Sequence, residues 1–256
     1  MGQPIVLLHG VGLDASIWDS VIAALTDGGQ VDADSVVALD LPGHGDRPPL
    51  DSPVGLAELA GDVVGRLPGD PGEPVHLVGF SLGSLIAQYI AVHCPERVSS
   101  LTCVSSVCAR TPEESAAVRQ RLNTAAEDFP LSANRALERW FPDDAGLPDA
   151  PALRERTRRI LLANDVDSYL HAYRVFAEGD RDLADDLHRI DVPVLAVTGE
   201  LDPGSTPGMS HRIAERIPGT PVHVIGGARH MVPDTHPEDV AALIRENVGR
   251  AADLRR

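Results

Sequence analysis

The first residue with clear catalytic potential is a serine set between two glycines. Residues 79–83 read Gly-Phe-Ser-Leu-Gly, which matches the pattern G-x-S-x-G around Ser81. The motif directly follows the apolar run 75–78 and directly precedes an amphipathic stretch over 82–93. A strand, a sharp turn and a helix in this order expose a serine hydroxyl as a nucleophile, whereas the motif without that context indicates only a tight turn. The context therefore favours acyl transfer through Ser81.

A serine nucleophile needs a general base, and the base needs an acidic group that orients it. Asp202 follows the strand-like run 194–197, and His230 follows the run 222–225. Both residues are expected on loops at the carboxyl ends of parallel strands, which is also where Ser81 is expected. We therefore predict that His230 takes the Ser81 proton and that Asp202 orients His230.

Two neighbouring residues are alternatives for these roles. Glu200 could replace Asp202 as the acid, and His236 could replace His230 as the base. His236 lies further from its strand and directly before a proline-led helix. The end of another strand-like run could also supply the acid, but Ser105 stands there.

An acyl-transfer site also needs hydrogen-bond donors for the oxyanion. One expected donor is the backbone N–H of Leu82, which follows the nucleophile. The other is expected from the loop after the first strand-like run, and we assign it to the N–H of Val11. His9 in the same loop is expected to hold the loop in place rather than to carry protons.

The same loop allows a different class of function. Residues 10–15 match G-x-G-x-x-A after a strand, and Asp40 ends the next strand, where a dinucleotide-binding fold places its ribose acid. This interpretation does not account for Ser81, Asp202 or His230. Asp40 also leads into the turn-rich loop 41–45. The hydrolytic interpretation explains more of the sequence.

The apolar pattern of the chain predicts the strands and helices that position these residues. Short apolar runs recur at residues 5–8, 36–39, 75–78, 101–104, 194–197 and 222–225. Runs of this length that are apolar on both faces are typical of a parallel sheet covered on both sides. Helical patterns lie between them, at 17–25, 56–67, 82–93, 211–217 and 237–248. The alternation predicts an α/β fold.

One long segment interrupts this alternation. Between residues 104 and 194 no strand-like run is present, but four helices are predicted, the first from a capping box at Thr111 and the others near 131–141, 151–163 and 167–177. We expect residues 111–188 to form a helical cap over the carboxyl edge of the sheet. Residues 1–110 and 189–256 then form the core.

Composition narrows the classes of function. The chain has 256 residues, 22 basic and 38 acidic, and a formal net charge of −16. This charge disfavours nucleic acid and anionic membranes as partners. Every basic residue is arginine, which excludes chemistry that needs a lysine, such as Schiff-base formation. A serine mechanism needs no cofactor, and Cys94, Cys103 and Cys108 lack the spacing of zinc ligands, so we expect neither cofactor nor metal.

The sequence also lacks the signals of export. Residues 1–8 carry no positively charged leader, and no apolar run approaches the roughly 18 residues of a membrane span. We expect a soluble cytoplasmic protein with reduced cysteines, acting on a small molecule.

Several segments together resemble the α/β-hydrolase superfamily over nearly the whole chain. They are Trp18 and residues 7–10, 40–45, 79–83, 199–202 and 227–230. The resemblance implies a mostly parallel, eight-stranded sheet with a helical cap inserted after its sixth strand. The sequence begins at the third strand of that pattern, so we expect the leading hairpin to be absent and one sheet edge to be shorter. Dehalogenases of this superfamily use an aspartate nucleophile, so Ser81 excludes their activity.

The second half of the chain most resembles 3-oxoadipate enol-lactonases, through residues 109–113, 162–165, 169–173 and the Asp202 loop. Those lactonases carry Asn-Ser where this chain has His9-Gly10, a form shared by ring-fission C–C hydrolases and carboxylesterases. The C–C hydrolases have Ser-Met-Gly-Gly at the elbow, and this chain has Ser-Leu-Gly-Ser. The resemblance implies hydrolysis of a small, carboxylate-bearing ester or lactone. A C–C bond hydrolase, and a ligand sensor that keeps an intact triad, are the alternatives.

Aromatic and basic residues of the cap are candidates for contacts with the substrate. The aromatic candidates are Trp18, Trp140, Phe141, Tyr169, Tyr173 and Phe176, although such a stripe also fits plain packing. A substrate carboxylate would need an arginine facing the pocket, and Arg110, Arg139 and Arg174 are the candidates. The run of arginines over 154–159 is more typical of a solvated face paired with nearby carboxylates.

Overall fold

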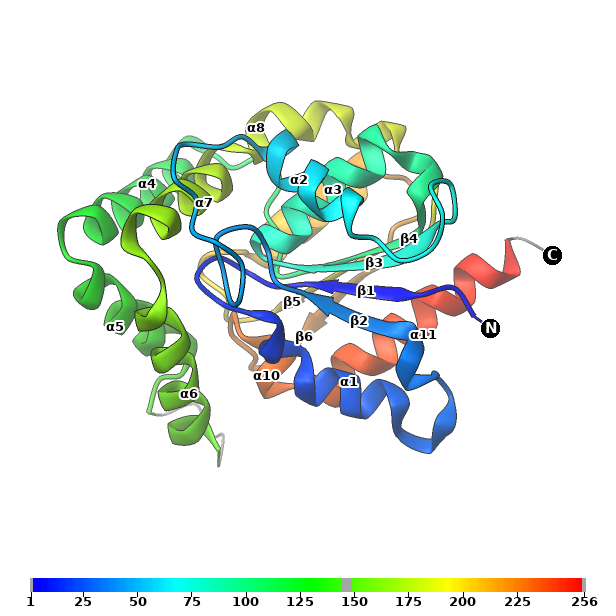
Figure 1. Ribbon diagram of the computed structural model, residues 1–256, viewed down its shortest axis with the longest axis horizontal. Helices are drawn as coiled ribbons and strands as arrows, with labels where there is room; N and C mark the ends of the chain where they lie inside the picture. The colour runs from blue at the N-terminus through cyan, green and yellow to red at the C-terminus, as the bar shows by residue number, and fades with distance from the viewer. Residues whose placement is uncertain (1, 144–148, 255–256) are drawn as a thin grey trace.

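A six-stranded parallel sheet forms the centre of the computed structural model, which describes residues 2–143 and 149–254. The strands stand in the order β2-β1-β3-β4-β5-β6 (Figure 1). They are β1 (Ile5–Leu8), β2 (Val36–Leu39), β3 (Val75–Phe80), β4 (Val98–Val104), β5 (Val194–Gly199) and β6 (Val222–Ile225). The predicted strands and their parallel arrangement are confirmed, with six strands among the described residues instead of the eight that the resemblance implied.

Helices cover both faces of the sheet. On one face α1 (Asp19–Thr26) packs against α11 (Pro237–Asp253), and on the other α2 (Leu56–Gly65) packs against α3 (Leu82–His93) (Figure 1). The helix α9 (Pro207–Arg216) packs on β5. Because both faces are covered, β1, β3, β4 and β5 are buried along their whole length, which explains their unbroken apolar pattern.

The segment between β4 and β5 is helical, as predicted. It holds α4 (Pro112–Glu127), α5 (Phe129–Trp140), α6 (Ala150–Ala163) and α7 (Val166–Glu178), followed by α8 (Asp180–Leu183). Figure 1 shows α4 to α7 grouped in green beside one end of the sheet. We assign residues 111–188 to a cap, of which residues 144–148 lie outside the described residues. None of the helices in the described ranges is long and apolar enough to cross a membrane.

The short segments that link the main elements are mostly 3-10 turns. They are η1 (Ala15–Trp18), η2 (Asp27–Gly29), η3 (Ala33–Ser35), η4 (Pro95–Arg97) and η5 (Ala184–Arg189), and a further short helix is α10 (Val232–Thr235). Two of them matter for the site, because η1 follows the β1 loop and α10 begins two residues after His230.

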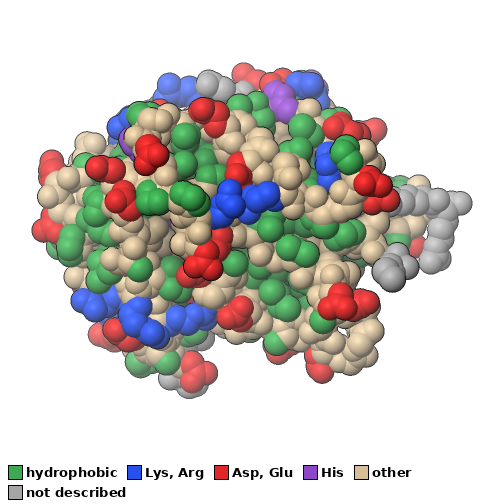
Figure 2. Space-filling model, viewed as in Figure 1, with side chains coloured by type: hydrophobic (Ala, Val, Ile, Leu, Met, Phe, Trp, Pro, Cys, Tyr) green, Lys and Arg blue, Asp and Glu red, His purple; other side chains and the backbone are tan. Residues whose placement is uncertain are grey.

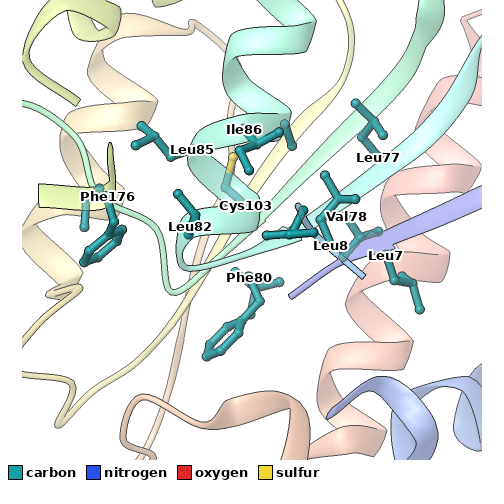
Figure 3. Packing of buried hydrophobic residues seen from close by; sticks show 14 of the residues in the cluster. Leu7, Leu8, Leu77, Val78, Phe80, Leu82, Leu85, Ile86, Cys103 and Phe176 are labelled. Carbon is teal, nitrogen blue, oxygen red and sulfur yellow. The ribbon is translucent and has the colours of Figure 1, made fainter. Parts of the chain in front are cut away.

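The apolar core surrounds the turn between β3 and α3. Figure 3 shows Leu7 and Leu8 of β1, Leu77 and Val78 of β3, and Leu85 and Ile86 of α3 in one cluster. Each of these side chains is at most 1% exposed, and burying one such side chain stabilises a fold by about 1.5–3 kcal/mol. The turn that carries Ser81 is therefore supported by fully buried side chains of β1, β3 and α3.

Candidate active site

Ser81 occupies a strained turn between β3 and α3. Its backbone has φ 54° and ψ −114°, a left-handed φ that is uncommon for a residue other than glycine and costs of order 1–3 kcal/mol. The Ser81 N–H donates to the carbonyl of Val104 at 3.0 Å, which ties the turn to β4. The strain places the hydroxyl at the carboxyl end of the sheet, as a nucleophile elbow requires.

The glycines on either side of Ser81 allow the turn to close. A Cβ at Gly79 would clash with the backbone of Gly83 and Ser84, and a Cβ at Gly83 would clash with the carbonyls of Leu8 and His9. Without those Cβ atoms, the Gly83 N–H donates to the His9 carbonyl at 3.0 Å. The elbow and the loop after β1 are thereby held against each other.

Asp202 and His230 meet at the ends of β5 and β6. His230 Nδ1 donates to Asp202 Oδ2 at 2.6 Å, and both residues are buried. The other carboxylate oxygen, Oδ1, accepts the N–H groups of Gly204 at 2.8 Å and Ser205 at 2.9 Å. With its Nδ1–H committed to Asp202, His230 presents Nε2 as the proton acceptor.

Close packing of the two loops brings these side chains together. The Leu201 N–H donates to the Ala228 carbonyl at 2.8 Å. Gly199 lies so close to the carbonyls of Ala228 and Arg229 that a Cβ would clash with both. The Asp202 loop and the His230 loop therefore form one hydrogen-bonded unit, although the two residues are 28 positions apart.

The alternative acid and base make other contacts. Glu200 is exposed, and its carboxylate accepts the N–H of Gly227 at 2.8 Å, so it supports the turn before His230. His236 exchanges a hydrogen bond with the hydroxyl of Thr235 at 2.8 Å. Neither residue lines the pocket that contains Ser81.

Two backbone N–H groups are available for an oxyanion. The N–H of Leu82 opens α3, where the helix dipole favours negative charge, and the N–H of Val11 lies in the loop after β1. Within the part of the chain that the structure describes, neither N–H donates to a protein acceptor. Gly10 allows that loop to approach the nucleophile, because its Cβ position would lie only 3.1 Å from Ser81 Cβ.

His9 holds the loop after β1 in place, as expected. Its Nε2 accepts the N–H of Leu41 at 2.9 Å and its Nδ1 donates to the Gly10 carbonyl at 2.8 Å. Burial, reinforced by the neighbouring His44, keeps the pKa of His9 well below its ordinary value, so the ring stays neutral.

Asp40, the candidate ribose acid, instead binds backbone groups of the protein. Its carboxylate accepts the N–H groups of Ala15 at 2.8 Å and Asp46 at 3.1 Å. A Cβ at Gly45 would collide with this carboxylate, so Asp40 fastens two loops together. The glycine motif at residues 10–15 therefore belongs to the hydrolytic framework rather than to a ribose site.

A pocket of about 100 Å³ lies between the loops of the core and the cap helices. From the core it is lined by Ser81, Asp202, His230, Val11 and Phe80. From the cap it is lined by Arg121, Arg139, Trp140, Tyr169, Tyr173 and Phe176. Five side chains proposed from the sequence as candidate substrate contacts thus line the same pocket as Ser81: Arg139, Trp140, Tyr169, Tyr173 and Phe176.

The other four candidates do not line the pocket: Trp18, Phe141, Arg110 and Arg174. Trp18 is fully buried and packs edge-to-face on Phe80, with ring centroids 6.5 Å apart, so the indole supports the pocket wall from inside the core. Arg110 is also buried, where it pairs with Asp180 at 2.6 Å and lies over the Phe176 ring at 4.6 Å. Its Nη1 donates to the Asp180 carboxylate and to the Phe176 carbonyl, and Arg110 does not line the pocket. Arg174 is exposed and does not line the pocket either.

Sequence reasoning missed Arg121, which α4 directs into the pocket. Its guanidinium lies 4.0 Å from the Cβ position of Gly204, beside the Asp202 loop. Arg121 directly precedes Leu122, which packs against the apolar core. A search for apolar spacing passes over a cation beside an apolar position, so the sequence does not distinguish Arg121 from the other arginines of the cap.

Arg121 and Arg139 together make the cap side of the pocket positive. Among the described residues, neither forms an ion pair with a carboxylate. Burial lowers the pKa of Arg139, and the charge of Arg121 lowers it further. Two guanidinium groups near each other without an acidic partner suit an anionic ligand.

The arginine run of α6 has a different role. Arg156 pairs with Asp234 at 3.2 Å and also donates to the Ser16 carbonyl, which fastens α6 to η1 and α10. Arg154 pairs with Asp143 at 3.2 Å. Basic atoms gather at the lower left of Figure 2, over α6, where they meet solvent. The predicted pairing with carboxylates is confirmed for both residues, but only Arg154 pairs on a solvated face, because the partner of Arg156 is buried.

We predict that Asp234→Asn changes the pH dependence of stability. The side chain is buried, and one carboxylate oxygen has no hydrogen-bond partner among the described residues. Burial raises the pKa of Asp234 to about 6, because it outweighs the attraction of Arg156. The protonated carboxyl therefore favours the folded state at low pH, and this contribution is lost as pH rises through about 6.

The stability of Asp234→Asn minus that of the parent should rise as the pH is raised from about 4 to about 7, by at most about 2–3 kcal/mol. Urea unfolding across that pH range measures the difference, and Asp51→Asn, at an exposed loop position, is the control. If the difference in unfolding free energy between the two proteins does not vary with pH, Arg156 offsets the whole effect of burial on the Asp234 carboxylate.

Within the described ranges, no group of three or more His, Cys, Asp or Glu side chains is placed to hold a metal ion. The acid–base groups of the pocket are instead the hydrogen-bonded pair Asp202 and His230. The arrangement is one that supports nucleophilic catalysis by Ser81.

Comparison with known proteins places this chain among hydrolases. The model of the Alpha/beta hydrolase family matches residues 5–243. The chain is 33% identical over 240 residues to an (E)-2-((N-methylformamido)methylene)succinate hydrolase from Acinetobacter baylyi, covering 93% of this chain and 88% of the relative. It is 25% identical over 221 residues to 3-oxoadipate enol-lactonase 2 of the same organism, covering 86% and 79%.

Among solved structures, the enol-lactonase from Burkholderia xenovorans superposes with a TM-score of 0.83. The match covers 97% of this chain and 92% of the other, at 23% sequence identity. At that identity the similarity shows the fold, and the resemblance to this superfamily and to enol-lactonases that the sequence suggested is confirmed.

Proposed function

Because the chain belongs to the alpha/beta hydrolase family and is a hydrolase, we propose that it cleaves a small ester or lactone that carries a carboxylate. One observation carries the proposal: the hydrogen-bonded pair Asp202 and His230 shares a pocket with Ser81 and with two arginines that have no acidic partner among the described residues. The first three residues supply the chemistry, and the arginines supply the preference for an anion.

In the first half of the proposed reaction, His230 Nε2 takes the proton of Ser81 as its oxygen attacks the substrate carbonyl. The N–H groups of Val11 and Leu82 stabilise the resulting oxyanion, and Asp202 stabilises the imidazolium. Since Asp202 is itself held by the N–H groups of Gly204 and Ser205, little reorganisation is needed as charge develops.

In the second half, His230 returns the proton to the leaving oxygen, which departs as an alcohol or, in a lactone, stays attached to the acyl chain. A water molecule then attacks the acyl-enzyme with His230 again acting as base. The pocket of about 100 Å³ suits a small acyl group.

The carboxylate preference follows from local charge. The net charge of −16 repels an anion at long range, but salt screens that field over about 8–10 Å. Inside the pocket, a guanidinium binds a carboxylate through paired hydrogen bonds, and this contact outweighs the distant field. The names of both relatives are consistent with a carboxylate-bearing substrate, because succinate and oxoadipate each contain carboxyl groups.

A turnover panel tests this proposal. It pairs short neutral esters with carboxylate analogues of the same size, and it adds 3-oxoadipate enol-lactone and a ring-fission dienoate. We expect the carboxylate ester or the lactone to be preferred. A preference for neutral esters would leave a general carboxylesterase, and turnover of the dienoate alone would favour the C–C hydrolase.

Substituting the arginines separates their charge from their bulk. We predict that Arg139→Gln or Arg121→Gln lowers kcat/KM for the carboxylate ester about 10–100-fold, since a hydrogen bond to a charged group contributes roughly 1.5–3 kcal/mol. Activity on the neutral ester should change less than about threefold by the same reasoning. The controls are Arg135→Gln on α5 and Arg119→Gln on α4, which are exposed positions of the same helices. Equal losses on both esters would contradict a carboxylate site.

A further inference from the structure

We infer that Trp140 is a positioning residue for the catalytic base, and that its indole ring stabilises His230 when the imidazole is protonated. This inference rests on the proposed function, in which His230 carries the proton. Trp140 lines the pocket, but its closest described ring partner is the imidazole and not another cap side chain.

The two rings are stacked. Their centroids lie 5.6 Å apart, and the planes are inclined by only 26°. Among the described residues, His230 has one other aromatic contact, with Phe80 at 4.9 Å and an inclination of 43°. Tyr173 and Phe176 face the same pocket without such a contact to His230. Trp140 thus differs from the other aromatic residues of the cap.

The end of α5 holds Trp140 in this position. Trp140 is the last residue of the helix, and the next residue, Phe141, leaves the helical conformation with its side chain buried. The Phe141 N–H still donates to the Leu137 carbonyl at 2.8 Å, which anchors the end of the helix. The indole can therefore reach His230 without losing its support in the cap.

The chemistry of the stack favours the charged form of the base. The face of an indole ring is electron-rich and attracts a cation within about 6 Å of the centroid. His230 is neutral before reaction and cationic once it has taken the Ser81 proton. An interaction that strengthens only at that point lowers the barrier rather than the KM. Because Trp140 belongs to the cap helices and His230 to a loop of the core, this ring contact links the cap to the proposed base.

Other charged groups near these rings must be kept constant in a test. The titratable and charged side chains that share the main pocket with His230 are Asp202, Arg121, Arg139, Tyr169 and Tyr173. Trp140 also lines a neighbouring pocket with Arg229 and His236. Changing Trp140 alone leaves all of them in place.

The kinetic test compares Trp140→Leu with Trp140→Phe on a small activated neutral ester across pH. We expect Trp140→Leu to lower kcat/KM about 3–30-fold and to move the acid limb of the pH profile to lower pH by up to about one unit, because the imidazolium loses a stabilising partner. Trp140→Phe should keep kcat/KM and the position of the acid limb close to those of the parent. Tyr173→Leu, which changes the pocket wall without touching His230, should not move the acid limb.

A second measurement does not depend on turnover. Protonated imidazole quenches the fluorescence of a stacked indole, and the sequence has two tryptophans, of which Trp18 is fully buried. We expect emission to fall as pH drops, and we expect His230→Gln to abolish the fall while the control His236→Gln keeps it. An unmoved acid limb in Trp140→Leu, or equal profiles for the Leu and Phe variants, would overturn the inference. The inference also fails if His236→Gln, rather than His230→Gln, abolishes the quenching. If the parent protein turns over no ester at all, the proposed function fails instead.

Discussion

Replacing Ser81 with alanine is expected to lower turnover by roughly four to six orders of magnitude, because the acyl-enzyme can no longer form. The turn itself should survive, since alanine is no larger than serine and the flanking glycines remain. Initial rates on the preferred ester, with circular dichroism to check folding, measure the effect. Near-normal turnover by a folded Ser81→Ala protein would rule out the mechanism.

A matched control lies three residues further along the chain. Ser84 is buried in α3 and does not line the pocket, so Ser84→Ala should retain activity. A fluorophosphonate probe adds a direct readout, because it should label the parent and Ser84→Ala but not Ser81→Ala. Labelling at Ser81 without multiple turnover on any ester or lactone would instead favour a ligand sensor.

Asp202→Asn is expected to lower kcat by about three to four orders of magnitude. Asp202 Oδ1 accepts two backbone N–H groups, so the asparagine oxygen would keep that place and its NH2 group would face His230 Nδ1. Nδ1 would then have to accept a hydrogen bond from that NH2 group, so the single ring proton would lie on Nε2, which could no longer act as base. The loss should appear in kcat while the fold is retained.

Glu200→Gln is the comparison for this variant, because Glu200 lies two residues away in the same loop. Its carboxylate accepts one N–H, from Gly227, and a glutamine oxygen can accept the same bond. We expect a change of less than about threefold, in keeping with an exposed hydrogen bond. The opposite ranking of the two variants would make Glu200 the acid.

Some elements escaped the sequence-based prediction for identifiable reasons. The helix α9 begins at Pro207, four residues before the predicted start at residue 211, because its first turn is polar and is set by a cap from Thr206. The short segments α8 and α10 were not predicted. An element of four residues is too short to show periodicity, so its formation depends on what packs against it.

The sequence by itself determined the features that depend on neighbouring residues. The apolar runs predicted each strand, and the glycines around Ser81 predicted the sharp turn, because both are properties of a few consecutive side chains. The positions of Asp202 and His230 after two strands were also readable, since parallel strands end at the same edge of a sheet. These features follow from local geometry and strand direction.

Only the tertiary structure decided which cap residues face the pocket. From the sequence Arg110, Arg121 and Arg139 are equivalent cations, but Arg110 is buried against Asp180 while the other two line the pocket. Trp18 and Trp140 are likewise both large aromatic residues, and only Trp140 reaches His230. The direction of each side chain depends on how its helix or turn is rotated against the core, and that rotation is set by long-range packing rather than by spacing along the chain.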